Sequence, residues 1–231
     1  MIRLDKYISN ATDLSRSEVK RLIKYGEVTV DNDPVTNSAQ KVTGSEDICI
    51  EGSTISMAKN RYFMLHKPTG VVSATKDNNN RTALELIYEH RSAELQIAGR
   101  LDIDTTGLLL VTDDGQWNHK LTSPRSNCQK IYEVKLGIPI TPDYQDKLAK
   151  GVWLEGEKHP CLPATLKVID DRTVVLSIAE GKYHQVKRMF AALGNHVEAL
   201  HRTQVGGIIL DEDLEPGDYR PLTEQEVAGI L

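Results

Sequence analysis

Apolar residues near the start of the chain predict two short helices followed by small strands. Leu4 and Ile8 lie four positions apart, as on one face of a helix. Ser15 and Glu18 match a capping box, which predicts a second helix over about 16–25. The segments that follow alternate between apolar and polar residues and predict strands over 28–35 and 47–50.

The remainder of the chain shows many short strand patterns with helix patterns inserted between them. Strands are predicted over 62–65, 71–72, 131–136, 164–169, 173–178, 196–200 and 208–210. Helices are predicted over 82–89, 116–121, 185–193 and between Pro142 and Gly151. Because the strands and helices do not alternate regularly, we expect an α+β fold with a mixed, mainly antiparallel sheet.

A weakly patterned segment separates these two regions. Residues 52–60 are rich in small side chains and match neither a helix nor a strand pattern. We therefore expect a linker there, between a small α/β domain over 1–58 and a larger domain over 61–231.

Two aspartates stand directly before the most apolar run of the second region. Asp102 and Asp104 are followed by Thr105, Thr106 and Gly107, and then by residues 108–111, which are all apolar. An apolar run of this length next to turn residues predicts a buried strand. The carboxylates would then lie at the edge of the core, where local hydrogen bonds fix their orientation.

Simpler and rival interpretations exist for this acidic segment. The two aspartates could merely cap a turn between strands. An aspartic protease would need two copies of the string Asp-Thr-Gly. This chain has Asp-Thr-Thr-Gly at residues 104–107 and no second copy. A calcium loop would need acidic ligands at positions that Leu108–Leu110 occupy.

The charge of the chain is unevenly distributed. The net charge of −5 at first argues against a nucleic-acid partner, whose phosphates attract lysine and arginine. Residues 211–231, however, hold seven acids and one arginine, so this segment carries −6 and the first 210 residues carry +1. On the predicted second helix, a continuous basic arc is formed by Arg16, Lys20, Arg21 and Lys24. This arc could be an ordinary solvated face or a phosphate-binding ridge.

Other features limit the location and the chemistry. Cys49, Cys128 and Cys161 share no metal-type spacing, so free thiols in a reducing compartment are expected. No apolar run approaches a membrane span, and the first residues do not resemble a signal peptide, which together predict a cytoplasmic protein. The seven histidines form no recognised metal motif, and no glycine-rich phosphate loop is found, so we expect neither a metal nor a cofactor.

Several strings resemble the RsuA-type branch of the RNA pseudouridine synthases, which acts on ribosomal RNA. The resemblance covers nearly the whole chain, in the strings 61–70, 99–108, 112–117 and 180–190. It implies an S4-like RNA-binding domain at the N-terminus and a catalytic domain that isomerises uridine without a cofactor. The family usually has Asn where this chain has His66, and the sequence gives His66 no definite role.

The resemblance also assigns roles to single residues. It implies that Asp102 is the essential carboxylate, that Tyr132 stacks on the extruded base and that Lys187 is the basic partner of Asp102. Asp104 is interpreted as structural. Arg100 and Arg188 are candidates for filling the vacated base stack or binding a phosphate, and Leu200 for a wall of the base pocket. For Tyr132 and Leu200, packing in the core is the alternative.

Two classes of function remain open at this stage. The favoured one is a monomeric enzyme that forms pseudouridine in small-subunit 16S ribosomal RNA, either free or in a ribosome-assembly intermediate. Sister branches that modify large-subunit RNA share these motifs. The other class is an RNA-binding assembly factor with an S4-like domain and a catalytically silent second domain. The presence of Asp102, Tyr132 and Lys187 together favours the enzyme.

Overall fold

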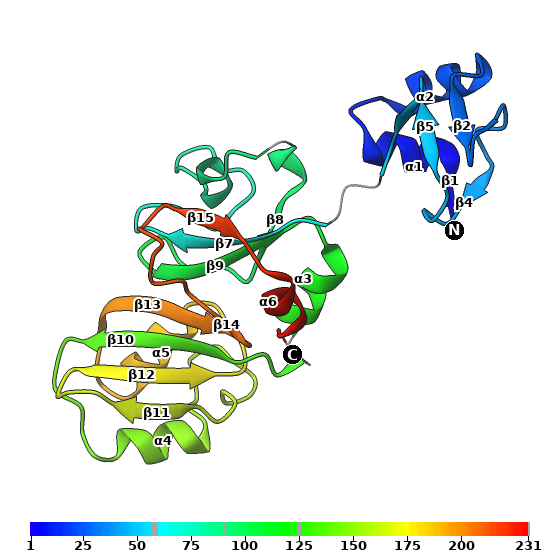
Figure 1. Cartoon of the computed structure of the whole chain (residues 1–231). Coiled ribbons are helices and arrows are strands. Elements are labelled where there is room, and N and C mark those ends of the chain that lie inside the picture. The colour runs from blue at the N-terminus through cyan, green and yellow to red at the C-terminus, as the bar shows by residue number, and fades with distance from the viewer. Residues whose placement is uncertain (57–59, 90, 124–125, 231) are drawn as a thin grey trace. The chain divides into compact units, whose positions relative to one another are not determined.

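The computed structural model describes residues 1–56, 60–89, 91–123 and 126–230. The chain divides into two compact units, Met1–Lys59 and Asn60–Leu231 (Figure 1). Residues 57–59 of the predicted linker lie outside the described residues.

The first unit contains two helices and small antiparallel strands. The helices are α1 (Leu4–Ala11) and α2 (Arg16–Lys24). The strands are β1 (Ile2–Arg3), β2 (Val28–Val30), β3 (Asp33–Pro34), β4 (Lys41–Val42), β5 (Ile48–Ile50) and β6 (Ser53–Thr54). One face of each helix packs on the sheet, in a core that includes Leu4, Ile8, Val19, Ile23 and Ile48.

The predicted capping box of α2 is confirmed. The Ser15 hydroxyl accepts a hydrogen bond from the Glu18 amide (3.3 Å), and the Ser15 amide donates to Glu18 Oε2 (2.8 Å). Both bonds satisfy backbone groups that have no partner within the first helical turn. The helix therefore begins at a position that the local sequence specifies.

The second unit is built on a nine-stranded sheet. Its strands are β7 (Tyr62–Lys67), β8 (Gln96–Ala98), β9 (Thr106–Thr112), β10 (Lys130–Leu136), β11 (Thr165–Val168), β12 (Thr173–Ile178), β13 (Val197–Val205), β14 (Ile208–Ile209) and β15 (Tyr219–Pro221). Their main order is β11-β12-β10-β13-β9-β7-β15, with β14 beside β13 and β8 beside β9. Only the β13–β9 pair is parallel among the described strands. The expected α+β fold with a mixed, mainly antiparallel sheet is confirmed.

Helices cover this sheet and complete its two main cores. They are α3 (Gly115–Thr122), α4 (Tyr144–Lys150), α5 (Gln185–Ala192), α6 (Glu224–Ala228) and the 3-10 helices η1 (Ala83–Leu86) and η2 (Ser92–Glu94). Helices α4 and α5 pack with β10, β12 and β13, whereas α3 and the C-terminal segment pack with β9 and β14 (Figure 1). Because β9 has core on both faces, its residues form a continuous apolar run rather than an alternating one.

Two local predictions were wrong. Val71 and Val72 form no strand, and only an isolated bridge joins Val72 to Thr82. Over 82–89 the chain makes the short 3-10 helix η1 instead of an α-helix. The helix begins at the capping box formed by Thr82 and Glu85, and it ends at Ile87, whose backbone is extended.

The parallel contact between β9 and β13 joins the two parts of the sheet. Gly107 faces Arg202 across this contact, and a Cβ atom at Gly107 would lie 2.2 Å from the Arg202 carbonyl oxygen. Gly107 also has a φ of +102°, which side-chain-bearing residues rarely adopt. Glycine therefore allows the close strand approach directly after the acidic segment.

No helix in the described part of the chain combines the length and apolar character needed to cross a membrane. Among the described residues, His, Cys, Asp and Glu side chains do not gather in threes as a metal site would require.

Candidate active site

Asp102 lies in a short loop between β8 and β9, at the junction of the two parts of the sheet. The Asp102 carbonyl accepts a hydrogen bond from the Thr105 amide (3.1 Å), which closes a turn. On the other side, the Leu101 amide donates to the Ser73 hydroxyl (3.0 Å). The predicted buried strand β9 follows at once, so the carboxylate is held at the edge of the core.

A buried lysine at the end of β7, which was not predicted as a site residue, holds this loop in place. Lys67, at the end of β7, is 0% exposed. Its ammonium donates to the carbonyls of Pro68 (2.9 Å), Thr105 (2.8 Å) and Ile103 (3.3 Å). Burial lowers the pKa of Lys67 to about 8. Two of these carbonyls belong to the loop of Asp102, so Lys67 positions that loop.

A buried arginine holds the loop from the β13 side and was also missed. Arg202 is 2% exposed. Its guanidinium donates to the carbonyls of Leu108 (2.8 Å), Gly99 (2.9 Å) and Arg100 (3.5 Å). No carboxylate among the described residues forms an ion pair with it. Arg202 therefore ties both ends of the Asp102 loop to β13 and leaves its positive charge uncompensated.

Two basic side chains from the start of α5 approach Asp102. His184 Nε2 lies 3.4 Å from Asp102 Oδ1, and Lys187 Nζ lies 3.7 Å from Asp102 Oδ2. The predicted proximity of Lys187 to Asp102 is thus present. His184 was not predicted, although it stands within the string 180–190; it precedes α5 with left-handed backbone angles (φ 47°, ψ 36°).

Asp104, which was expected to be structural, is closer to Lys187 than Asp102 is. Lys187 Nζ donates to both carboxylate oxygens of Asp104, at 2.6 and 2.7 Å. This bond lowers the pKa of Asp104, whose side chain is 62% exposed. Lys187 is therefore shared between the two aspartates, and its hydrogen bonds go to the outer one.

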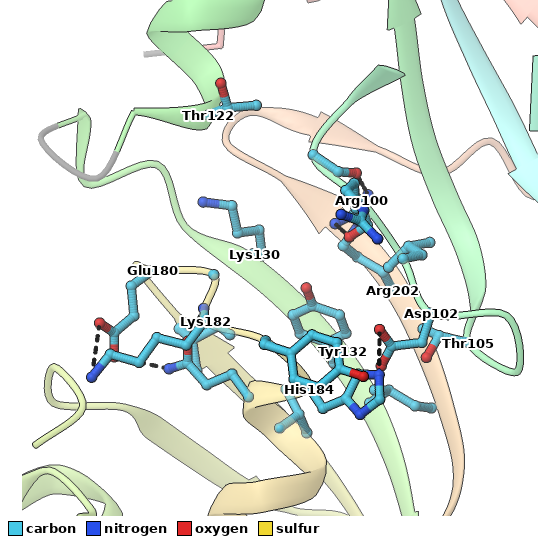
Figure 2. A pocket seen from close by; sticks show the side chains of 18 of the residues that line it. Arg100, Asp102, Thr105, Thr122, Lys130, Tyr132, Glu180, Lys182, His184 and Arg202 are labelled. Atoms are coloured by element: carbon cyan, nitrogen blue, oxygen red, sulfur yellow. Dashed lines mark hydrogen bonds and ion pairs between the residues drawn. The ribbon is translucent and has the colours of Figure 1, made fainter. Parts of the chain in front are cut away.

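A pocket of about 550 Å³ opens beside Asp102. Figure 2 shows Tyr132 in the middle of this pocket, with Asp102 on one side and Lys130 and Thr122 on the other. Tyr132 and Lys130 come from β10, and Leu200 and Arg202 from β13. The pocket also contains Thr105, whose buried hydroxyl has no hydrogen-bond partner among the described residues.

The structure brings some predicted site residues into the pocket and excludes one. Asp102, Tyr132, Arg100 and Leu200 line it, and Lys187 contacts Asp102 at its edge. Arg188 does not line the pocket, and its binding of RNA, in the vacated base stack or at a phosphate, stays a prediction. Its guanidinium donates to Glu157 Oε1 (2.9 Å) and to the carbonyls of Glu155 (2.6 Å) and Tyr183 (3.0 Å). These bonds hold α5 to the preceding loops.

The rings of His66, in β7, and His201, in β13, pack against each other. Their ring centroids are 5.4 Å apart. His66 Nδ1 is 2.7 Å from the Leu214 carbonyl, and His201 Nδ1 is 2.8 Å from the Thr106 hydroxyl. Burial lowers the pKa of His201, and the nearby His66 lowers it further. His66 thus connects β7 to the C-terminal segment, a structural contact that its sequence position did not reveal.

In the first unit, a buried acid organises part of the basic arc. Asp5 is 0% exposed and contacts Arg3 (2.9 Å), Arg16 (3.1 Å) and Lys20 (4.0 Å). The hydrogen bond from Arg3 is the main reason that the pKa of Asp5 is lowered to about 2. Asp5 therefore orients Arg16 and Lys20, and it also holds Arg3, which precedes α1 and is not part of the predicted arc. Arg21 and Lys24 lie exposed on the same helix.

Comparison with known proteins identifies the family. Residues 61–192 match the family model described as RNA pseudouridylate synthase, and residues 2–48 match that of the S4 domain. The chain belongs to the RNA pseudouridylate synthase family. It is 52% identical over 231 residues to "Ribosomal small subunit pseudouridine synthase A" of Vibrio cholerae, with 99% of each chain covered. It is 50% identical to the protein of that name from Escherichia coli strain K12, with 100% of each chain covered.

A solved structure agrees with this assignment. The chain matches "Crystal structure of pseudouridylate synthase" with a TM-score of 0.73 and 42% sequence identity, and the match covers 100% of both chains. The expected family and the S4 domain are therefore confirmed, and the protein is an RNA pseudouridine synthase.

A test of the Lys187 contact follows from its geometry. Lys187→Met keeps an unbranched apolar stem but removes the cation that favours a negative charge on the nearby carboxylates. We expect the acidic limb of the rate-versus-pH profile to move to higher pH. Single-turnover rates on RNA from pH 5 to 9 would measure the shift. Lys167→Met, on the exposed face of β11, should leave the profile unchanged; an identical profile for both variants contradicts a role for Lys187.

Proposed function

We propose that the protein isomerises a uridine of small-subunit ribosomal RNA to pseudouridine without a cofactor. One observation carries the proposal: a pocket pairs the carboxylate of Asp102 with the ring of Tyr132, in a chain about half identical along its whole length to relatives named for this activity. The reaction breaks the N1–C1′ bond of uridine and forms a C5–C1′ bond. A proton leaves C5 and a proton is gained at N1, so no oxidant or reductant is needed.

The reaction requires the target base to leave its stack in the RNA. Extrusion of a base costs a few kcal/mol, and stacking on an aromatic ring returns about 1–3 kcal/mol. We assign this stacking to Tyr132, and the apolar wall beside the base to Leu200. Arg100 is exposed next to Asp102 and is suited to fill the vacated stack or to bind a phosphate.

In the proposed mechanism, Asp102 supplies the essential negative charge or nucleophile. Its loop is tied to the protein through Lys67 and Arg202, so little reorganisation is needed when the base enters. His184 Nε2 and Lys187 Nζ lie 3.4 and 3.7 Å from this carboxylate, so both side chains limit its movement.

Release of tritium from RNA labelled at uracil C5 tests the reaction directly. We expect stoichiometric release from small-subunit ribosomal RNA, or from a partly assembled small-subunit particle, and none from large-subunit RNA. Release from large-subunit RNA alone would support the sister-branch alternative. Tight RNA binding without release from any substrate would support the assembly-factor alternative and contradict the proposed activity.

The basic arc of the S4 domain is proposed to bind RNA phosphates through Arg16, Lys20, Arg21 and Lys24. Replacing Arg16, Lys20 and Lys24 together with Ala should weaken RNA binding. The dependence of log K on log salt should flatten by about 0.7–0.9 units for each lost contact. Titrations at several salt concentrations would measure this slope.

The matched control for this experiment is Lys135→Ala, an exposed lysine of β10. It should leave the slope unchanged. The chemical step at saturating RNA should survive in the triple variant, because these residues bind rather than react. An unchanged salt slope in the triple variant would contradict the proposed ridge.

We also propose that the protein acts as a monomer in the cytoplasm, on ribosomal RNA or a ribosome-assembly intermediate. The three cysteines are free, which suits a reducing compartment. Sedimentation of the free protein at several concentrations would test the oligomeric state.

A further inference from the structure

A second buried lysine lies in the pocket, on the side of Tyr132 away from Asp102 (Figure 2). Lys130 is 8% exposed. Its ammonium donates one hydrogen bond, to the Cys128 carbonyl (2.8 Å), and no carboxylate among the described residues forms an ion pair with it. An ammonium carries three donors, so this group retains hydrogen-bonding capacity toward a ligand in the pocket.

The side chains that line the pocket carry more positive than negative charge, which favours binding of an anion. The lining includes four cationic side chains, Arg100, Lys130, Lys182 and Arg202, but only two acidic ones, Asp102 and Glu180. Each acid has basic partners of its own: Asp102 is near His184 and Lys187, and Glu180 is near Lys182. Arg100, Lys130 and Arg202 therefore have no carboxylate partner among the described residues, and of these three Lys130 and Arg202 are buried, within a protein whose net charge is −5.

The buried position of Lys130 is unfavourable in the free protein. Burial lowers its pKa, and repulsion from Arg202 lowers it further, whereas the neighbouring Cys128 acts in the opposite direction. Burying a charge is costly unless an opposite charge compensates it. A bound anion would provide this compensation, and a neutral base edge would not.

Position along β10 relates this charge to the base pocket. Lys130 and Tyr132 are two residues apart on one strand, so their side chains leave the same face, about 7 Å apart. An extruded nucleotide remains joined to the RNA by phosphates on both sides of its ribose. A strand whose base stacks on Tyr132 would therefore bring a phosphate near Lys130.

We propose that Lys130 binds a phosphodiester adjoining the target uridine, so that the pocket holds the RNA backbone as well as the extruded base. This inference rests on the proposed function and deepens it. The substrate is then recognised as a nucleotide within a strand, and Lys130 contributes binding energy on the side of the base opposite the reacting carboxylate.

Single neutralised phosphates test this contact. Short target RNAs would each carry one uncharged methylphosphonate, at successive positions around the target uridine. Equilibrium binding would be measured for the wild-type protein and for Lys130→Met, which keeps the apolar stem without the charge. For the wild type, we expect neutralisation at one position to weaken binding by about tenfold or more, as for a lost charge-assisted hydrogen bond.

The same position should have no further effect in Lys130→Met. This variant should bind unmodified RNA about tenfold more weakly and show a salt slope lower by about 0.7–0.9 units. Lys130→Arg should restore part of the binding and part of the methylphosphonate effect, because it keeps the charge.

Lys135→Met is the matched control, since it removes an exposed lysine from the same strand. It should bind like the wild type and keep the full methylphosphonate effect. The proposal is overturned if every methylphosphonate weakens Lys130→Met and the wild type equally. It is also overturned if Lys130→Met lowers the melting temperature and the saturated rate but leaves RNA affinity and its salt slope intact, because Lys130 would then only support the Cys128 segment.

Equilibrium binding does not require turnover, so this result is separable from the proposed activity. Absence of tritium release by the wild type on every RNA would contradict the proposed function even if the phosphate coupling were present. Normal release without any coupling would contradict the role of Lys130 alone.

Discussion

Asp102→Asn is expected to lower the rate of pseudouridine formation by at least three orders of magnitude. Such a loss corresponds to about 4 kcal/mol of activation free energy. Asn has nearly the shape of Asp and keeps one carbonyl acceptor, but it carries no negative charge and is a poor nucleophile. The side chains of Lys67 and Arg202 hold the loop through hydrogen bonds to its backbone carbonyls, which the substitution does not alter. The variant should therefore fold normally. Single-turnover tritium release would measure the effect.

Asp104→Asn is the internal control for this experiment. It removes the carboxylate that accepts both hydrogen bonds from Lys187, but it leaves Asp102 in place. We expect a loss of no more than about tenfold, since the affected interaction is an exposed ion pair. A larger chemical defect in Asp104→Asn than in Asp102→Asn would show that the essential carboxylate has been misassigned.

Lys67→Met is expected to lower kcat/KM by about a hundredfold, the effect that a displacement of about 1 Å in a catalytic group can have. The substitution removes the Lys67 donor from the carbonyls of Pro68 and Thr105, so the loop of Asp102 loses support. The Ile103 carbonyl keeps the hydrogen bond from the Gly70 amide. The free energy of unfolding should also fall, because a buried polar group without a partner costs about 1–3 kcal/mol. Activity and thermal unfolding would be measured together.

The control for this change is Lys76→Met, which removes an exposed lysine and should alter neither property. A normal rate in Lys67→Met would contradict the positioning role.

The pH dependence of stability gives a separate check on Lys67. Its pKa is about 8 in the folded protein and about 10.5 when it is unperturbed. Between these pH values the unfolded chain holds more protons, so Lys67 makes the free energy of unfolding rise with pH. Below pH 8 the lysine is charged in both states and contributes no slope. Denaturant titrations from pH 7 to 10 should show this rise in the wild type and its loss in Lys67→Met.

Much of the architecture could be predicted because its signals are local. The Ser15–Glu18 capping box specifies where α2 begins, and the apolar run after Gly107 predicts β9 as a strand buried on both faces. The family strings predict which residues face the base, and the structure places Asp102, Tyr132, Arg100 and Leu200 around one pocket.

Predictions failed where partners come from distant parts of the chain. Val71 and Val72 favour a strand, but β7 is already paired with β9 and β15, so they find no place in the sheet. Strand β13 was predicted only to residue 200, because the polar residues after it do not resemble a buried strand. These polar residues continue β13 because Arg202 pairs with Tyr132 of β10 on one side and with Gly107 of β9 on the other.

By itself, the sequence determined the family, the two helices of the S4 domain, the buried strand after the acidic segment and the aspartate at its edge. The tertiary structure alone decided which charges are buried. Lysine and arginine are usually exposed, and nothing near Lys67, Lys130 or Arg202 in the sequence predicts otherwise. Lys67 and Arg202 are buried because carbonyls from 36 to 103 positions away converge on them, and such convergence exists only once β7, β9 and β13 have assembled around the loop of Asp102.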